Sequence, residues 1–303
     1  MPGNDYEVII VGGGPAGLSA ALVLGRCCRR VLVCDSRKYR NERSSALHCF
    51  LGHDGIHPGK FLDMVRTQLE PYENVKYRVG NVTNATRVGS AFGLAFADGE
   101  LRTADKVLVA SGVVDEPPQV PGLMEFYGTT VHVCPYCDGW EHREKGIAVY
   151  GRGEKGEQLA HLLRQWTDDL VLCTDGPTEF DESQTARLER RGVRVRDTRI
   201  ARLEGSNGHL ECIVFSDGSR LVRHGLFFTT GQHPRSPILA QLGCDFDERG
   251  GVVCGEDCTT NIPGVYAAGD VSRDVQIAII AAAEGARAAL AINKELVAEA
   301  IGR

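Results

Sequence analysis

Several features that would set a chain apart from ordinary globular proteins are missing here. No apolar run approaches the ~20 residues that a membrane-spanning helix needs, and Val8 to Val11 is too short for the core of a secretory signal. The net charge is −6, from 34 basic and 40 acidic residues, so no basic excess indicates a nucleic-acid partner. We therefore expect a cytoplasmic protein that binds neither membrane nor nucleic acid.

The cysteines do not form the framework of a small secreted protein, because there are eleven and they are spread along the chain. One pair stands out, in Cys134-Pro135-Tyr136-Cys137-Asp138. Cysteines at this spacing can close and reopen a disulfide, and a helix N-terminus at the first sulfur would stabilise a thiolate. The following acid can supply or take the proton that thiol exchange requires.

Two other interpretations of this pair are half of a zinc site and two buried thiols. A zinc site needs a second ligand pair at matching spacing, and Cys254 and Cys258 are spaced differently and lie far away in the sequence. We therefore predict a redox-active pair and no metal. His132 and His142 flank it and titrate near neutrality, so either could relay protons, unless they are structural or surface histidines.

The N-terminal residues carry a dinucleotide-binding pattern. A strand at Tyr6 to Val11 leads into Gly12-Gly13-Gly14-Pro15-Ala16-Gly17, and a helix of small residues follows. The strand Val31 to Cys34 then ends at Asp35, an acid 23 residues after Gly12 that can accept from a ribose hydroxyl. Strand, glycines, helix, strand and acid together predict nucleotide binding, with a pyrophosphate at the helix N-terminus.

The segment Ser36 to Leu51 is polar and irregular. Arg40 and His48 could reach a cofactor from it, although a solvated loop is as good an interpretation. Residues 75–82 and 91–97 alternate like antiparallel strands, and the prolines at 117, 118 and 121 suit an interdomain linker.

A second copy of the nucleotide-binding pattern follows the redox pair. A strand at Gly146 to Tyr150 precedes the glycine turn Gly151 to Gly156, a helix at about 157–165 and a strand at Leu170 to Cys173. This copy is altered: Glu154 is unfavourable beside a pyrophosphate, and Asp175 stands where a 2′-phosphate would need arginine. Asp175 could suit the ribose of NADH, so NADH, NADPH or no nucleotide all remain open.

Taken together, these motifs resemble the low-molecular-weight thioredoxin reductase family of flavoprotein disulfide oxidoreductases. Ala110-Ser111-Gly112 and Ala268-Gly269-Asp270, before an alanine-rich helix at Val275 to Leu290, complete the resemblance. It implies an α/β fold with two Rossmann-like nucleotide-binding domains, one inserted in the other, and a homodimer. Residues 1–114 and 227–303 would form the FAD-binding domain, and residues 115–226 an inserted NAD(P)-binding-like domain that carries the redox pair.

The resemblance also assigns roles to single residues. The ADP half of FAD would be held by Gly12, Gly14, Ala16 and Asp35, and the adenine would contact Val82. The ribitol would bind Asp270, the flavin ring would meet Gln276 and Ile277, and the cofactor would run past Gly112. Pro15, Ser36 and Gly269 lie in the same segments and are included as FAD-site residues, together with Arg40 and His48. Cys137 would face the flavin and Cys134 would exchange with the substrate, with Asp138 as proton donor or acceptor.

At two places the sequence departs from the pattern of the NADPH-dependent members, and both departures resemble the dithiol oxidase branch of the family. The NADPH-dependent members carry His-Arg-Arg where this chain has Thr174-Asp175-Gly176, and their redox pair commonly encloses Ala-Thr rather than Pro135-Tyr136. Enzymes of that branch, as in gliotoxin and holomycin biosynthesis, close a disulfide in a small metabolite and pass electrons through FAD to oxygen. We therefore expect oxidation of a small dithiol. The alternatives are an NAD(P)H-dependent reductase of thioredoxin or a thioredoxin-like protein, and a flavin-binding redox sensor without turnover.

Overall fold

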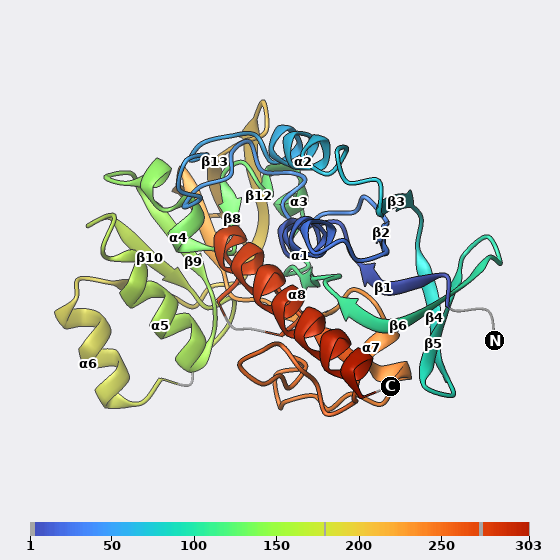
Figure 1. The fold of residues 1–303 in the computed structure, drawn as a ribbon. Coiled ribbons are helices and arrows are strands. Elements are labelled where there is room, and N and C mark those ends of the chain that lie inside the picture. The colour runs from blue at the N-terminus through green and yellow to red at the C-terminus, as the bar shows by residue number, and fades with distance from the viewer. Residues whose placement is uncertain (1–3, 179, 273–274, 303) are drawn as a thin grey trace. The chain divides into compact units, whose positions relative to one another are not determined.

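The computed structural model describes residues 4–178, 180–272 and 275–302 (Figure 1). The chain folds into two compact units. The first comprises Met1–Glu42, Cys49–Val114 and Gln232–Arg303, and the second comprises Arg43–His48 and Asp115–Gly231. The chain passes from one unit to the other at β7 (Val113–Glu116) and β16 (Gly231–Pro234), which pair with each other in a short sheet.

The first unit is built on a parallel sheet. Its parallel neighbours, in order, are β3 (Val75–Val79), β2 (Val31–Asp35), β1 (Tyr6–Val11), β6 (Leu101–Val109) and β17 (Val265–Ala267). Most of these strands are buried aliphatic runs, as expected where both faces of a sheet are covered. β6 pairs with β1 on one side and with two strands on the other: its first half pairs antiparallel with β5 (Ala91–Phe96), which in turn pairs with β4 (Val82–Val88), and its second half pairs with β17.

Two helices of the first unit pack closely, side by side (Figure 1). α1 (Pro15–Arg26) begins at a proline, whose fixed φ and missing N–H suit the first helical position. α8 (Ala278–Ile301) crosses it at a glycine, since a Cβ on Gly285 would lie 1.9 Å from Ala16 O. Glycine at 285 is therefore what permits this approach. α2 (Pro58–Thr67) and α7 (Ile238–Gln241) also belong to this unit.

The second unit repeats the order of four strands of the first, but its fifth strand, β8 (Val131–His132), precedes the others in the chain, whereas β17 follows them. Its parallel neighbours, in order, are β11 (Arg194–Arg196), β10 (Leu170–Cys173), β9 (Ile147–Tyr150), β15 (Gly225–Phe228) and β8. α5 (Gly153–Leu163) and α6 (Glu182–Arg190) connect the first three strands in sequence. A separate antiparallel sheet contains β12 (Ile200–Ser206), β13 (His209–Phe215) and β14 (Arg220–Val222). The shared strand order gives both units Rossmann-like topology, which confirms the predicted fold class.

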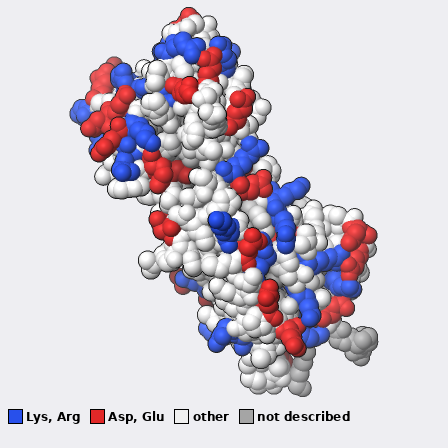
Figure 2. Space-filling model, turned by 90° about the horizontal axis from the view of Figure 1, so that it is seen from above, with Lys and Arg blue, Asp and Glu red and all other residues white. Residues whose placement is uncertain are grey.

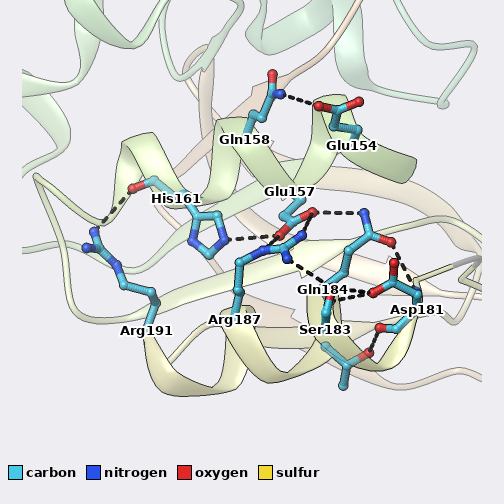
Figure 3. A network of polar contacts seen from close by, with 10 residues as sticks. Glu154, Glu157, Gln158, His161, Asp181, Ser183, Gln184, Arg187 and Arg191 are labelled. Carbon is cyan, nitrogen blue, oxygen red and sulfur yellow. Dashed lines mark hydrogen bonds and ion pairs between the residues drawn. The ribbon is translucent and has the colours of Figure 1, made fainter.

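A buried carboxylate joins α5 and α6 of the second unit (Figure 3). Glu157 of α5 accepts hydrogen bonds from Arg187 Nε (2.7 Å) and Gln184 Nε2 (2.9 Å) of α6, and His161 Nε2 lies 3.4 Å from its Oε1. Asp181 caps α6 in a reciprocal capping box with Gln184. Glu157 is thus fully occupied by structural contacts.

The structure differs from the sequence-based expectations in three places. The predicted division at 226/227 would cut β15, which pairs with β9 and β8, so the second unit continues to Gly231. Residues 75–79 pair parallel with β2, whereas β4 is the antiparallel partner of β5, because the alternating pattern runs across the turn between β3 and β4. α8 begins at Ala278 and continues past Leu290 to Ile301, where its charged turns pair with the sheet.

Candidate active site and cofactor site

The redox pair lies at the end of β8. Cys134 caps the short helix α4 (Pro135–Asp138), and its Sγ accepts a hydrogen bond from Cys137 N at 3.1 Å. The two cysteines form a disulfide, with their Cα atoms 5.3 Å apart. One turn of α4 separates the two cysteines and brings their sulfurs within bonding distance.

A chain of polar contacts leads away from the pair. His132 Nδ1 lies 3.3 Å from Asp138 Oδ1, and His132 Nε2 lies 3.0 Å from His142 Nε2 and 3.1 Å from Thr129 O. Both histidines are buried. The structure therefore brings Asp138, His132 and His142 together beside the disulfide.

The two histidines differ in their electrostatic surroundings. Burial lowers the pKa of His142 to about 4, with further lowering by His132 and Lys145 that outweighs the opposing effect of Asp138. His142 is consequently a neutral imidazole at physiological pH. It can accept or donate a hydrogen bond to His132 without competing for the positive charge.

Aromatic side chains stand on the surface next to the disulfide. Tyr136 is 59% exposed and Trp140 is 63% exposed. Tyr136 packs edge-on against Trp166, and the Arg143 guanidinium lies 4.0 Å from the centre of the Trp140 ring. The sequence analysis singled out Tyr136 only as a departure from the family pattern and did not consider Trp140, although both stand within three residues of a redox cysteine.

The first glycine turn leaves room in front of a helix. Gly12 has φ +119°, and a Cβ there would lie 2.2 Å from Ala110 O, so glycine is required. A Cβ on Gly14, which caps α1, would meet nothing within 4 Å. The N-terminus of α1 thus has open space beside Gly14 and no side chain capping it, and this fits the pyrophosphate of FAD.

Asp35 ends β2 and is almost fully buried. Its Oδ1 accepts from Arg37 N at 2.8 Å, and its Oδ2 accepts from the hydroxyls of Tyr39 and Tyr77. Burial, and then the hydrogen bond to Asp35, raises the pKa of both phenols, so they remain donors. A carboxylate has about four acceptor positions, so Asp35 can still accept from a ribose. The two tyrosines are partners that the sequence pattern did not indicate.

A second polar cluster surrounds the residues predicted for the ribitol and the flavin ring. Arg40 Nη1 lies 3.2 Å from Asp270 Oδ2 and donates to Gln276 Oε1 at 2.5 Å. Gln276 Nε2 donates to Gln232 Oε1 at 2.8 Å, and Ile277 caps α8. The structure thus brings Arg40, Asp270 and Gln276 together. Gln232 was not singled out in the sequence.

The remaining residues predicted for FAD are dispersed over the first unit. Val82 is buried at the start of β4, and Gly112 has φ +68° with open space beside its Cα. Gly269 N donates to Glu284 Oε2 of α8 at 2.8 Å, which fixes the turn before Asp270. Asp270 itself precedes α8 by eight residues, so it does not lie at the helix start as expected.

Two predicted residues lie in the polar segment after β2. Ser36 is half-buried directly after Asp35. His48 groups with the second unit, where its Nε2 lies 3.5 Å from Glu141 Oε1. His48 therefore belongs to the segment Arg43–His48 of the second unit, whereas Ser36 belongs to the first.

The side chain of Arg152, which belongs to the second glycine turn, lies across that turn. Arg152 Nε donates to Thr174 O at 2.7 Å, and its Nη2 donates to Asp175 O. The carboxylate of Asp175 accepts from Ile200 N at 2.7 Å and from the Tyr150 hydroxyl at 3.0 Å. Asp175, the acid predicted to suit the ribose of NADH, is thus engaged by its own unit.

No helix within residues 4–178, 180–272 and 275–302 has the length and apolarity to cross a bilayer. Across the same residues, no group of three or more His, Cys, Asp or Glu side chains could hold a metal ion. Acidic and basic side chains are interspersed on the face shown in Figure 2.

Comparisons with known proteins decide the family. The pattern of the pyridine nucleotide-disulphide oxidoreductases matches residues 6–285. The chain belongs to this family. The oxidoreductase is 29% identical to the probable thioredoxin reductase of Arthroderma benhamiae, over 97% of this chain and 81% of that protein.

Solved structures of similar proteins support the same family assignment. The oxidoreductase superposes on the putative thioredoxin reductase TrxB of Bacillus anthracis with a TM-score of 0.92 and 31% identity, over 97% and 99% of the two chains. It superposes on HlmI with a TM-score of 0.94 and 32% identity, over 98% and 94%. The resemblance to thioredoxin reductases is confirmed, and the chain is an FAD-dependent oxidoreductase.

Proposed function

We propose that the oxidoreductase converts a small-molecule dithiol to a disulfide at Cys134 and Cys137, with oxygen as the final electron acceptor. The observation that carries this direction is the pair of contacts that Arg152 makes with the backbone of Thr174 and Asp175. A reductase needs a nicotinamide bound at that turn, and here the turn is occupied by the protein's own side chain.

Asp175 supports the same direction of reaction, because both of its carboxylate oxygens already accept hydrogen bonds. Ile200 N and the Tyr150 hydroxyl donate to it, and Arg152 Nη2 lies 3.6 Å from its Oδ2. A ribose would have to share the carboxylate with these donors beside a turn that Arg152 crosses, and a 2′-phosphate would meet a carboxylate in place of a cation. The residues of the second unit therefore favour a reaction without a nicotinamide, in which electrons enter through the disulfide.

The sulfur chemistry follows from the pair. A substrate thiolate attacks Sγ of Cys134, the bond to Cys137 breaks, and a mixed disulfide forms. The second substrate thiolate then attacks the substrate sulfur of that mixed disulfide and releases Cys134. The substrate has lost two electrons and the pair has gained them. When bound, FAD supplies the two-electron acceptor that restores the pair, and oxygen takes the electrons as hydrogen peroxide.

The neighbouring side chains would handle the protons. Asp138 follows Cys137 directly, and its carboxylate lies against His132, which in turn contacts His142. Asp138 exchanges a proton with the sulfurs, and the histidines behind it orient its carboxylate. The Cys137 N–H that donates to Cys134 Sγ stabilises negative charge on that sulfur as it attacks or leaves.

A second candidate is reduction of a thioredoxin-like protein with NAD(P)H. Relatives such as the bifunctional thioredoxin reductase/thioredoxin of Mycobacterium leprae, 28% identical over 94% of this chain and 64% of that protein, favour it. A homodimer is part of the proposal on family resemblance alone. A redox sensor without turnover is the third candidate.

An anaerobic titration of the holoprotein separates these candidates. We expect NADPH and NADH to leave the flavin absorbance unchanged and a small dithiol to bleach it. In air, the dithiol should yield hydrogen peroxide in equal amount. Rapid bleaching by either nicotinamide would reverse the proposed direction, and no turnover with any dithiol or disulfide would leave the sensor.

A further inference from the structure

The protein itself fills most of the hydrogen-bond positions of Asp35. An ionised carboxylate offers about four acceptor positions, roughly two on each oxygen. Oδ2 of Asp35 accepts from the hydroxyls of Tyr39 and Tyr77, and Oδ1 accepts from Arg37 N at 2.8 Å. Asp35 is 2% exposed, so these contacts take the place of bulk water around its charge. The acceptor position that is left for a ligand lies on Oδ1.

Both phenols act as donors toward Asp35. Arg66 Nη1, from α2, donates to the Tyr39 hydroxyl oxygen at 3.0 Å, and a guanidinium cannot accept, so the proton of this hydroxyl is directed to Asp35. If the proton of Tyr77 pointed elsewhere, its oxygen would face Oδ2 with lone pairs on both sides, which is unfavourable in a buried place. Burial and the hydrogen bond to Asp35 raise the pKa of both phenols, so both keep their protons near neutral pH.

The backbone of the first glycine turn covers the same carboxylate oxygen. A Cβ on Gly13 would lie 2.3 Å from Oδ2 of Asp35, so the Cα of Gly13 packs directly against it. Oδ2 is thus enclosed by two phenols and the glycine turn. Among the described residues, the hydrogen bond to Oδ1 comes from Arg37 N. The two oxygens of Asp35 are therefore not equivalent toward a cofactor.

We infer that Tyr39 and Tyr77 are positioning residues for FAD, which hold Oδ2 of Asp35 so that the carboxylate binds one hydroxyl of the ADP ribose through Oδ1. A carboxylate with both oxygens open could bind both ribose hydroxyls at once, one on each oxygen. Here the second oxygen serves the protein. Arg66, which also donates to Asp63, ties α2 into the same network. The inference concerns how the cofactor is held and goes beyond the proposed sulfur chemistry.

The test removes the ribose hydroxyls one at a time. FAD and its analogues built on 2′-deoxyadenosine and 3′-deoxyadenosine are loaded by exchange into the full-length holoprotein, both native and with Tyr39→Phe or Tyr77→Phe. The rise in flavin fluorescence on dilution gives the release rate of each flavin, which is where most changes in affinity appear.

We expect either phenylalanine variant to release FAD about 3- to 10-fold faster, because the carboxylate loses one of the hydrogen bonds that orient it. Release of the analogue that keeps the bound hydroxyl should accelerate by the same factor. Release of the other analogue should not change, because the hydroxyl that Asp35 binds is already missing from it. Tyr72→Phe is the matched control, since it removes a phenol hydroxyl whose partner is Arg26, and it should leave all three release rates unchanged.

Three results would overturn the inference. Equal acceleration of all three flavins would assign the two phenols to the stability of the fold alone. A partial effect on both analogues would mean that Asp35 binds both hydroxyls. Unchanged or slower release of FAD would mean that the phenols do not position the carboxylate. No thiol or nicotinamide is added, so the result is independent of the direction of turnover.

Discussion

The buried lysine under α8 offers a quantitative test of what holds the first unit together. Lys106 lies on β6 with its side chain 5% exposed, and its Nζ donates to Glu295 Oε1 at 2.6 Å and to Glu299 Oε1 at 2.5 Å. The Tyr266 hydroxyl donates to the other oxygen of Glu295. Lys106→Met keeps the apolar stem and removes the charge.

The expected loss of unfolding free energy follows from how deeply each partner of this ion pair is buried. Removing one partner of a fully buried ion pair costs about 3–5 kcal/mol, whereas an exposed pair contributes about 0–1 kcal/mol. The cation here is buried, but the carboxylates of Glu295 and Glu299 are 36% and 38% exposed and can turn to water. We expect Lys106→Met to lower the free energy of unfolding by about 2 kcal/mol, or roughly 4–8 °C in melting temperature.

The assay separates the two units, because both tryptophans, Trp140 and Trp166, lie in the second. FAD release in a thermal ramp would report the first unit, and tryptophan fluorescence the second. Lys106→Met should lower the FAD-release midpoint and leave the tryptophan midpoint unchanged. Lys294→Met, at an exposed position of the same helix, is the control and should change stability by less than about 0.5 kcal/mol.

The loss of stability in Lys106→Met should also depend on pH. Burial raises the pKa of Glu295, but the hydrogen bonds from Lys106 and Tyr266 outweigh it, so the pKa lies below its ordinary value. A carboxylate with a depressed pKa contributes stability above its unfolded pKa and loses it as the pH falls. The gap between the native protein and Lys106→Met should therefore shrink in acid. A constant gap, or a midpoint equal to that of Lys294→Met, would refute the reasoning.

Three further predictions follow from the second unit. Cys137→Ser should leave Cys134 able to form a lasting mixed disulfide with an aromatic thiol, seen by mass spectrometry, whereas Cys134→Ser should form none. Trp140→Ala should raise KM for an aromatic dithiol about 5- to 10-fold, the value of one lost ring contact, and leave dithiothreitol turnover unchanged; equal effects on both would exclude ring stacking. Glu157→Ala should lower the tryptophan-monitored stability by about 1 kcal/mol, because α5 and α6 lose the hydrogen bonds that join them while Arg187, which is 45% exposed, can turn to water, and an unchanged midpoint would contradict this.

Local patterns predicted much of the fold. The glycine turns are required by contacts of about 2 Å, as at Gly12, so their spacing in the sequence indicates the turn directly. Strands buried on both faces, such as β1 and β9, are continuous aliphatic runs and are equally visible. The place of β15 in the sheet was harder to predict from the sequence, because its partners β9 and β8 are distant in the chain and no local pattern encodes that pairing.

The redox site was partly visible from the sequence. The Cys-x-x-Cys-Asp spacing lies within one helical turn, so the disulfide could be anticipated from Cys134 and Cys137. The contact between His132 and His142 depends on how the 3-10 helix Trp140–His142 folds back toward β8, which spacing alone does not determine. Arg152 was overlooked because nothing in the glycine pattern indicates that its side chain turns back across the loop.

The crossing of α1 and α8 also bears on how the protein can be engineered. Gly285 touches the backbone of Ala16, two residues from the cap of the helix whose N-terminus fits the pyrophosphate. A tag or fusion partner attached beyond residue 302 is four turns removed from that crossing and should be harmless. Shortening the chain into this crossing would instead release the first helix and yield colourless protein.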